Sequence, residues 1–239
     1  LSSEFVAEFT AGYAQLWSPE IRVQHADADI TLKNLAIQKD ADTHLQLSSV
    51  DIAAVMTFAQ YLPLPDVLQQ VLTDLSPAGE LKNIHVDIHQ RAEQPLDFSL
   101  SAQLAAVSAN AWKGAPGVNN INGIVTASKL SGQVNLLTED LSLAFPTLYD
   151  DKMQFDTAEG IVSWWLDGED IYVKGQQLSL TGAYGDADGE FYLQIPKDKM
   201  QGDVGRLILG IGLKNSDVKY KNSFIPKILP QPLLTWLDD

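Results

Sequence analysis

The residues best suited to do chemistry are two histidines and an aspartate on one predicted strand. His85, Asp87 and His89 alternate with aliphatic residues. Alternate side chains of a strand leave the same face about 6.5–7 Å apart, so two imidazoles could share a metal ion. A metal site needs further ligands, and neither His25 nor His44 gives a local sign of converging there. The pattern equally fits the solvated face of an amphipathic strand, and we predict no metal and no cofactor.

Aspartates beside glycines form a second group. The segment Asp186-Ala187-Asp188-Gly189 carries part of a calcium-loop pattern, but the downstream ligands are absent. Asp and Gly are also the residues that tight turns favour, because Gly accepts positive φ without a steric clash. We therefore predict hairpin turns at Asp167-Gly168, Tyr184-Gly185 and Asp188-Gly189.

No other pattern of catalytic residues is complete. Ser216 and Lys219 have Ser-x-x-Lys spacing, but they lie in strand-like sequence rather than at a helix start. The segment Gly210-Ile211-Gly212 lacks the third glycine and the helix of a dinucleotide site. Adjacent carboxylates such as Asp150-Asp151 are expected by composition alone, since the chain has 31 acidic residues. The sequence predicts a protein that is not an enzyme.

Composition narrows the function classes further. The 239 residues include 16 basic and 31 acidic ones, for a net charge of −15. Such a surface repels phosphate backbones, so we expect no nucleic-acid partner. The absence of cysteine excludes disulfides, thiolate zinc sites and cysteine nucleophiles. No apolar run approaches the ~20 residues that span a bilayer. The first residue is Leu, so we expect a segment of a longer protein whose membrane anchor lies elsewhere.

Apolar residues recur with period two along most of the chain, which predicts strands with one apolar face and one solvent-exposed polar face. Clear examples begin at Ile84, Leu96, Leu141, Phe191 and Leu207. Two stretches have helical spacing or helix-limiting prolines instead, and we predict short helices within 51–75 and 228–238. No linker or composition shift divides the chain, so we treat residues 1–239 as a single segment.

The repeated apolar faces allow two architectures. In a closed β-sandwich, two sheets bury these faces against each other. In a strongly curved single sheet, the inner face would form a trough able to hold a hydrophobic ligand. Alternation alone leaves both open.

Several short motifs, in their order along the chain, resemble one protein family. Leu75-Ser76-Pro77-Ala78-Gly79-Glu80-Leu81 resembles its Leu-x-Pro-x-Gly-x-Leu entry to a central sheet. The glycine series Pro116-Gly117, Gly123 and Ser131-Gly132 follows, and then come, in order, Leu143-Ala144-Phe145-Pro146, Gly160, Trp164, Tyr220, Ile225-Pro226 and Trp236-Leu237. Together they resemble the central region of the YhdP proteins, which are AsmA-like envelope proteins of Gram-negative bacteria. Two residues depart from the pattern: Leu148 stands where the family would have an aromatic residue, and Phe224 replaces a Tyr or Trp.

The resemblance implies a mainly β fold: an elongated, strongly curved antiparallel sheet, like a half-pipe, with a few short helices. It also implies a periplasmic part of an inner-membrane-anchored protein that carries phospholipid towards the outer membrane, with other envelope proteins as further partners. The expected groove residues are Phe98, Leu100, Phe145, Val173, Leu180, Phe191, Leu193 and Leu209.

Three questions stay open from the sequence. The groove face cannot be chosen within residues 161–166, where both faces are partly apolar. A closed β-sandwich that serves as a scaffold or protein-binding module of the envelope is the alternative to a conduit. A glycan-active enzyme using Asp87, Asp150 or Asp151 is a further alternative.

Overall fold

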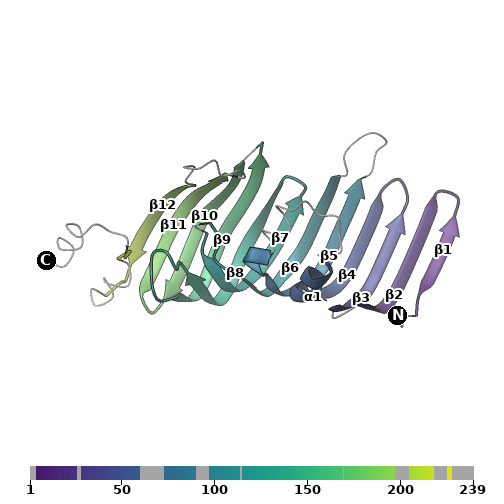
Figure 1. Cartoon of the computed structure of the whole chain (residues 1–239), viewed down its shortest axis with the longest axis horizontal. Coiled ribbons are helices and arrows are strands. Elements are labelled where there is room, and N and C mark those ends of the chain that lie inside the picture. The colour runs from purple at the N-terminus through teal and green to yellow at the C-terminus, as the bar shows by residue number, and fades with distance from the viewer. Residues whose placement is uncertain are drawn as a thin grey trace.

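The chain forms one continuous antiparallel sheet in which the strands follow one another in chain order (Figure 1). The computed structural model describes residues 4–25, 28–59, 73–89, 97–113, 115–168, 170–196, 205–217 and 225–227. The strands are β1 (Val6–Thr10), β2 (Tyr13–His25), β3 (Ala28–Lys39), β4 (Thr43–Asp51), β5 (Ala78–His89), β6 (Asp97–Ala109), β7 (Gly117–Ser128), β8 (Ser131–Ala144), β9 (Met153–Asp167), β10 (Asp170–Gly182), β11 (Gly185–Pro196) and β12 (Arg206–Lys214). The sheet is not closed, and the predicted mainly β fold is confirmed.

A short helix, α1 (Ile52–Ala59), follows β4 directly. The Asp51 carboxylate caps it by accepting a hydrogen bond from the Ala54 N–H at 2.8 Å. The helix contacts β3, β4 and β5, and residues 73–75 form a further helical turn. The prediction of helices within 51–75 is confirmed where the chain is described, whereas 228–238 lies outside the described residues. Among the described helices, none has the length and apolar character to cross a bilayer.

The register of the sheet gathers apolar residues on one face. Directly opposed residues of antiparallel neighbours share a face. One such row runs without interruption from β2 to β12, and we call it the floor row: Leu16, Ile37, Leu45, Val86, Leu100, Ala127, Gly132, Trp164, Val173, Leu193 and Leu207. We call the face that carries it the inner face and the opposite one the outer face.

Six strands contain an internal residue in the left-handed region, with φ between 48° and 64°. We call these residues the bulge belt: Asn34, Asn83, Ala106, Asn120, Asp140 and Gln177. In β6, for example, the inner-face positions run with period two to Leu104 and resume out of phase at Val107, where the register shifts. A bulge inserts one residue and bends its strand. The belt thus bends the sheet while returning the apolar residues to the same side.

Side chains satisfy the backbone and polar groups along the belt. Asn83 Nδ2 donates to Gln103 Oε1 at 2.9 Å across two strands. Asn122 Oδ1 accepts the Ala106 N–H at 3.0 Å, and its Nδ2 donates to the buried Thr138 Oγ1 at 2.8 Å. Side-chain hydrogen bonds of this kind supply partners where a bulge interrupts the backbone hydrogen bonds between strands.

The inner face holds two small buried clusters rather than one deep core. The first is Val50, Ile84, Ala102 and Val125, with Val55 of α1 packed against it, and the second is Leu136, Leu141, Phe155 and Ala158. Only twelve hydrophobic residues are buried in the described part of the chain. All strands there belong to one sheet, so no second sheet covers the inner face. The closed β-sandwich is therefore wrong for the described residues.

Two of the three predicted turns are confirmed. Asp167-Gly168 lies between β9 and β10, and Tyr184-Gly185 lies at the β10–β11 hairpin. The third, Asp188-Gly189, is wrong because it lies inside β11. A Cβ at Gly189 would lie 2.7 Å from the Gly210 carbonyl oxygen, so this glycine serves close strand approach rather than a turn.

Candidate functional site

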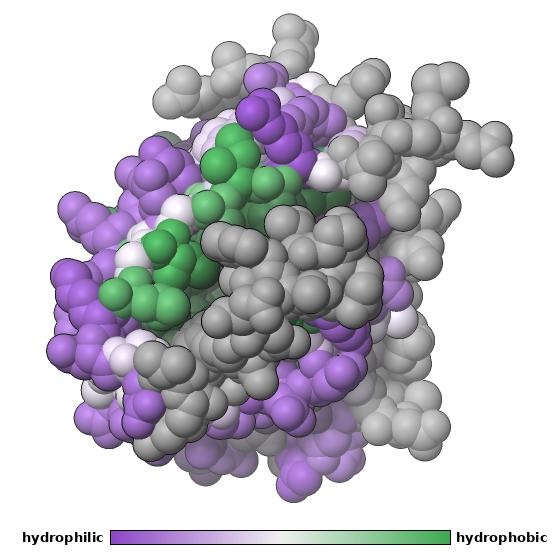
Figure 2. Space-filling model, turned by 90° about the vertical axis from the view of Figure 1, so that its left-hand side faces the viewer, coloured by the Kyte–Doolittle hydropathy of each residue, from purple (hydrophilic) through white to green (hydrophobic). Residues whose placement is uncertain are grey.

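The candidate site is the inner face itself, an apolar groove that runs across the strands. The floor row crosses ten strand spacings of about 4.8 Å, which gives a track roughly 48 Å long. Seen from the β12 end, hydrophobic residues form an oblique band from the upper centre to the left of the view, and hydrophilic residues border the band above and to the left (Figure 2). At this end the inner-face side chains of Leu209 and Ile211 are 56% and 58% exposed. A surface of this kind can accept an apolar ligand.

Helix α1 covers the groove near its N-terminal end. It contacts β3, β4 and β5, and Val55 packs against the first buried cluster. Ile84 beneath it is 4% exposed, whereas inner-face residues further along the floor row, such as Leu100 and Val173, are half-buried. Helix α1 therefore covers only the part of the inner face that lies over β3 to β5.

Glycines in the floor allow two aromatic rings to lie low over the sheet. A Cβ at Gly132 would overlap the indole of Trp164, and a Cβ at Gly175 would overlap the ring of Phe191. Each ring thus occupies the space above a glycine on the neighbouring strand. Because the rings fill that space, they line the floor and leave the groove above it open.

Seven of the eight residues expected in the groove lie on strands at inner-face positions. Leu100, Val173 and Leu193 belong to the floor row, and Phe191 pairs with Leu209. The remaining two, Phe98 and Leu180, pair with Ile88 and Ala158 respectively. Leu193 is the most buried of the seven, at 5% exposure.

Phe145 takes a different place. It follows the end of β8, and its ring meets Tyr149 edge-on with centroids 6.2 Å apart. It therefore lies at the border of the sheet rather than on a strand. Whether these eight residues contact lipid stays a prediction.

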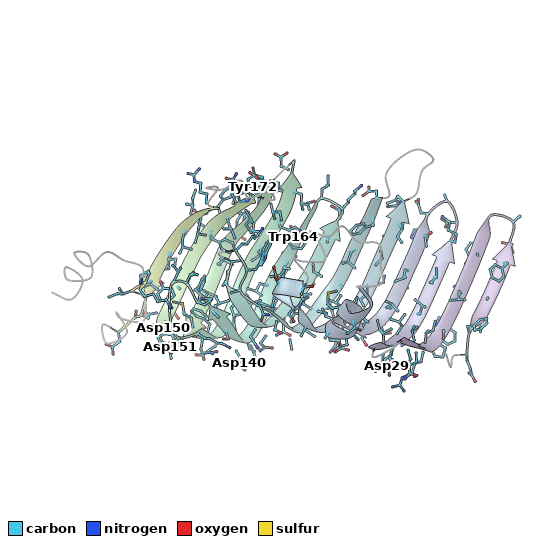
Figure 3. All side chains as sticks on the ribbon, in the orientation of Figure 1. Asp29, Asp140, Asp150, Asp151, Trp164 and Tyr172 are labelled. Atoms are coloured by element: carbon cyan, nitrogen blue, oxygen red, sulfur yellow. The ribbon has the colours of Figure 1, made fainter. Side chains whose placement is uncertain are left out.

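The structure resolves the face of residues 161–166. Val162 pairs with Val134, and Trp164 pairs with Val173 of the floor row, so both are on the inner face. Trp165 lies on the outer face, where its ring stacks on Tyr172 with centroids 5.3 Å apart. Figure 3 labels Trp164 and Tyr172, which come from neighbouring strands and opposite faces.

Sequence reasoning missed part of the floor. Leu16, Ile37 and Leu45 extend the floor row to β2 but were not among the expected groove residues. Their period-two spacing in the sequence was the signal that could have placed them on the apolar face of a strand. The two floor glycines, Gly132 and Gly175, were missed because nothing local distinguishes them from turn glycines.

Asp87 and His89 of β5 pair with side chains of β4 and of the β3–β4 connection on the outer face. His44 Nδ1 lies 2.6 Å from Asp87 Oδ1, and His89 Nδ1 lies 3.0 Å from Asp42 Oδ2. The hydrogen bond with Asp87 raises the pKa of His44 above its ordinary value of 6.5, and the same bond holds the pKa of Asp87 below 3.8. No group of three metal-ligating side chains occurs among the described residues.

Of the carboxylates considered for a glycan-active enzyme, Asp87 lies far from Asp150 and Asp151. Asp150 and Asp151 lie in the connection between β8 and β9, at the lower border of the sheet in Figure 3. Asp150 Oδ1 accepts a hydrogen bond from Lys227 Nζ at 2.6 Å. Asp87 lies on β5, four strands along the sheet from β9. The structure therefore does not pair Asp87 with Asp150 or Asp151.

Comparison with known proteins gives one match. A protein-family model described as YhdP protein matches residues 9–239. No curated protein matches the chain. No solved structure matches it either.

Proposed function

Because the chain belongs to the YhdP family of AsmA-like envelope proteins, we propose that it is a non-catalytic segment of a phospholipid conduit. Its inner face would shield acyl chains while the lipid moves between the inner and outer membranes of a Gram-negative envelope. The observation that carries the proposal is the uninterrupted floor row from β2 to β12.

The energetics favour such a track. A two-chain phospholipid exposes on the order of 30 methylenes, and at about 0.8 kcal/mol each their hydration opposes free passage through water by roughly 20 kcal/mol. A continuous apolar floor removes much of this barrier without any covalent chemistry. The conduit needs only continuity, and the floor row supplies it.

The composition of the floor row suits movement rather than tight binding. All eleven of its members are apolar or glycine, so none offers a charged or hydrogen-bonding side chain to hold a headgroup in one place, apart from the indole N–H of Trp164. A site that held one lipid strongly would delay the next. Uniform apolar contacts give similar energies at successive positions, which permits sliding.

The remaining parts of the proposal concern the parent molecule. The chain would be one stretch of a longer periplasmic groove, and the parent would be anchored in the inner membrane, with other envelope proteins among its partners. The net charge of −15 supports a soluble outer surface and disfavours lying flat on anionic membranes.

Photo-crosslinking from two neighbouring aromatic positions tests the proposal. Phe191 is on the inner face opposite Leu209, whereas Tyr192 is on the outer face, where it lies beside Trp165 with ring centroids 6.2 Å apart. A photoreactive phenylalanine at position 191 should form adducts with phospholipid in cells, and the same group at position 192 should not. Equal lipid labelling at both positions, or none at either, would contradict a lipid path on the inner face.

A further inference from the structure

The outer face carries a polar depression that the conduit does not use. It has a volume of about 550 Å³, within the range of small-molecule sites. Its polar side chains come from five successive strands, β5 to β9, and form a cross-strand row: His85, Ser101, Thr126, Gln133 and Ser163. The row spans four strand spacings of about 4.8 Å, or roughly 19 Å.

The depression exists because small side chains lie between larger ones. Five serines, among them Ser99 and Ser131, and Thr126 are six of its fourteen lining residues, and Leu100, Ala127, Gly132 and Trp164 of the floor row also line it. Trp165 of β9 forms the wall at one end and His85 of β5 lies at the other. A solvated sheet face with long polar side chains throughout would have no such low region.

The Trp165 ring packs against two aromatic neighbours and lines the depression. Its ring stacks on Tyr172 of β10 at 5.3 Å between centroids, and Tyr192 of β11 lies 6.2 Å away. On the opposite side Trp165 pairs with Ser131 of β8, whose short side chain leaves the indole open towards the depression. An indole fixed in this way can stack on a flat ligand surface.

The groups along the floor are uncharged and available. Within the described residues, Ser101, Thr126, Gln133 and Ser163 make no side-chain hydrogen bond. Hydroxyl and amide groups both donate and accept, so they suit a ligand with many hydroxyls. Asp87 contributes a carboxylate at the border, already engaged by His44 at 2.6 Å.

The charge of the chain and the position of the depression disfavour other classes of ligand. Among the described residues no Lys or Arg lines the depression, and the chain carries a charge of −15, so phosphates, nucleic acids and anionic headgroups are disfavoured. An extended peptide would gain its affinity by adding to a sheet edge, whereas this site lies over the middle of the sheet. A long, neutral, hydroxyl-rich ligand with an apolar ring face matches what remains.

We propose that this depression is a binding site for a neutral oligosaccharide, with one sugar ring stacked on Trp165 and the following rings hydrogen-bonded along the row from Ser163 to Ser101. The site lies on the face opposite the apolar groove. The same chain would therefore hold a glycan outside while lipid passes inside.

Titration calorimetry of the 239-residue chain with chitotetraose and with cellotetraose tests the proposal. We expect saturable binding of at least one of them, weakened tenfold or more by Trp165→Ala and by Thr126→Tyr, which fills the depression. Ile124→Tyr is the matched control, because Ile124 lies on the same strand and face, is 47% exposed and does not line the depression. This control should bind like the wild type.

Three results would overturn the assignment: no saturable binding of either saccharide, unchanged binding by folded Thr126→Tyr, or binding of inorganic phosphate at the same place. Thermal unfolding followed by circular dichroism establishes that each variant is folded, and Trp165→Ala provides the second test if Thr126→Tyr is not. Lipid crosslinking from position 191 reports on the groove separately, so failure of one proposal leaves the other standing.

Discussion

A single carboxylate placed in the floor of the groove should stop lipid passage more than lipid binding. Val134 is the position to change, because it lies on the inner face of the central strand β8, half-buried between Val125 and Val162. Its neighbour Asn135 is exposed on the outer face. Val134→Asp and Asn135→Asp therefore add the same charge, one residue apart, to opposite faces.

The magnitude follows from the spacing of the strands. A carboxylate keeps its hydration shell, which prevents close apolar contact over a length of roughly 6 Å, a little more than one strand spacing of ~4.8 Å. Roughly five methylenes of a passing acyl chain would then stay hydrated, at about 0.8 kcal/mol each, which adds about 4 kcal/mol to the barrier. This corresponds to passage about 10³-fold slower. Bound lipid is affected less, because apolar floor remains on either side of the charge.

Two measurements separate passage from occupancy. The first is the rate at which the protein transfers a fluorescent phospholipid between donor and acceptor vesicles, and the second is the lipid retained by the purified chain in native mass spectrometry. Val134→Asp should lose most transfer and keep part of its lipid, whereas Asn135→Asp should match the wild type in both. Val134→Thr, similar in shape but uncharged, should fall between them. Equal transfer by the two folded aspartate variants would refute an inner-face path.

Three further changes test the features that shape and stabilise the sheet. Asn122→Ala should lower the free energy of unfolding by about 1–3 kcal/mol in urea denaturation, because it leaves the buried Thr138 hydroxyl without its donor. Gly132→Val should destabilise by about 1–3 kcal/mol and shift tryptophan emission, since the new side chain displaces the indole above it. Asp87→Asn should lower the stability most between pH 3.8 and pH 6.5, and progressively less as the pH rises above 6.5, as measured by thermal unfolding across pH. The raised pKa of His44 gives stability that is full below pH 6.5 and lost as pH rises through that pKa, whereas the lowered pKa of Asp87 gives stability present above pH 3.8 and lost as pH falls through it. An unchanged free energy of unfolding in Asn122→Ala would contradict the first expectation, and unshifted tryptophan emission in Gly132→Val would contradict the second. A stability difference that does not vary with pH in Asp87→Asn would contradict the third.

Strand content and the existence of an apolar face were accessible from sequence because both are local. Each strand repeats apolar residues with period two, so the alternation alone assigns Leu100 and Val173 to the apolar faces of their strands. Residue types that favour turns were a less reliable guide to the positions of turns. Asp188-Gly189 has the same composition as a hairpin turn, yet its glycine is needed for close packing against β12.

The faces of residues 161–166 were undecidable from sequence for a physical reason. Both faces carry large side chains there, because Trp164 lines the groove and Trp165 belongs to an aromatic group with Tyr172 and Tyr192 on the outside. Only the pairing partners on β8 and β10 separate them. The outer depression was equally hidden, since it depends on small residues meeting across five strands.

The bulge belt links the fold to the kind of ligand that the groove accepts. A flat sheet with one apolar face would stack on another sheet, as in a sandwich or a fibril, and bury the face against protein. Here the bulges in β3, β5, β6, β7, β8 and β10 bend the strands, and a bent face has no matching surface on a second flat sheet. Acyl chains are flexible and conform to a curved surface without ordering a protein partner. The bulges therefore support the proposal that a lipid, rather than a second sheet, occupies the inner face.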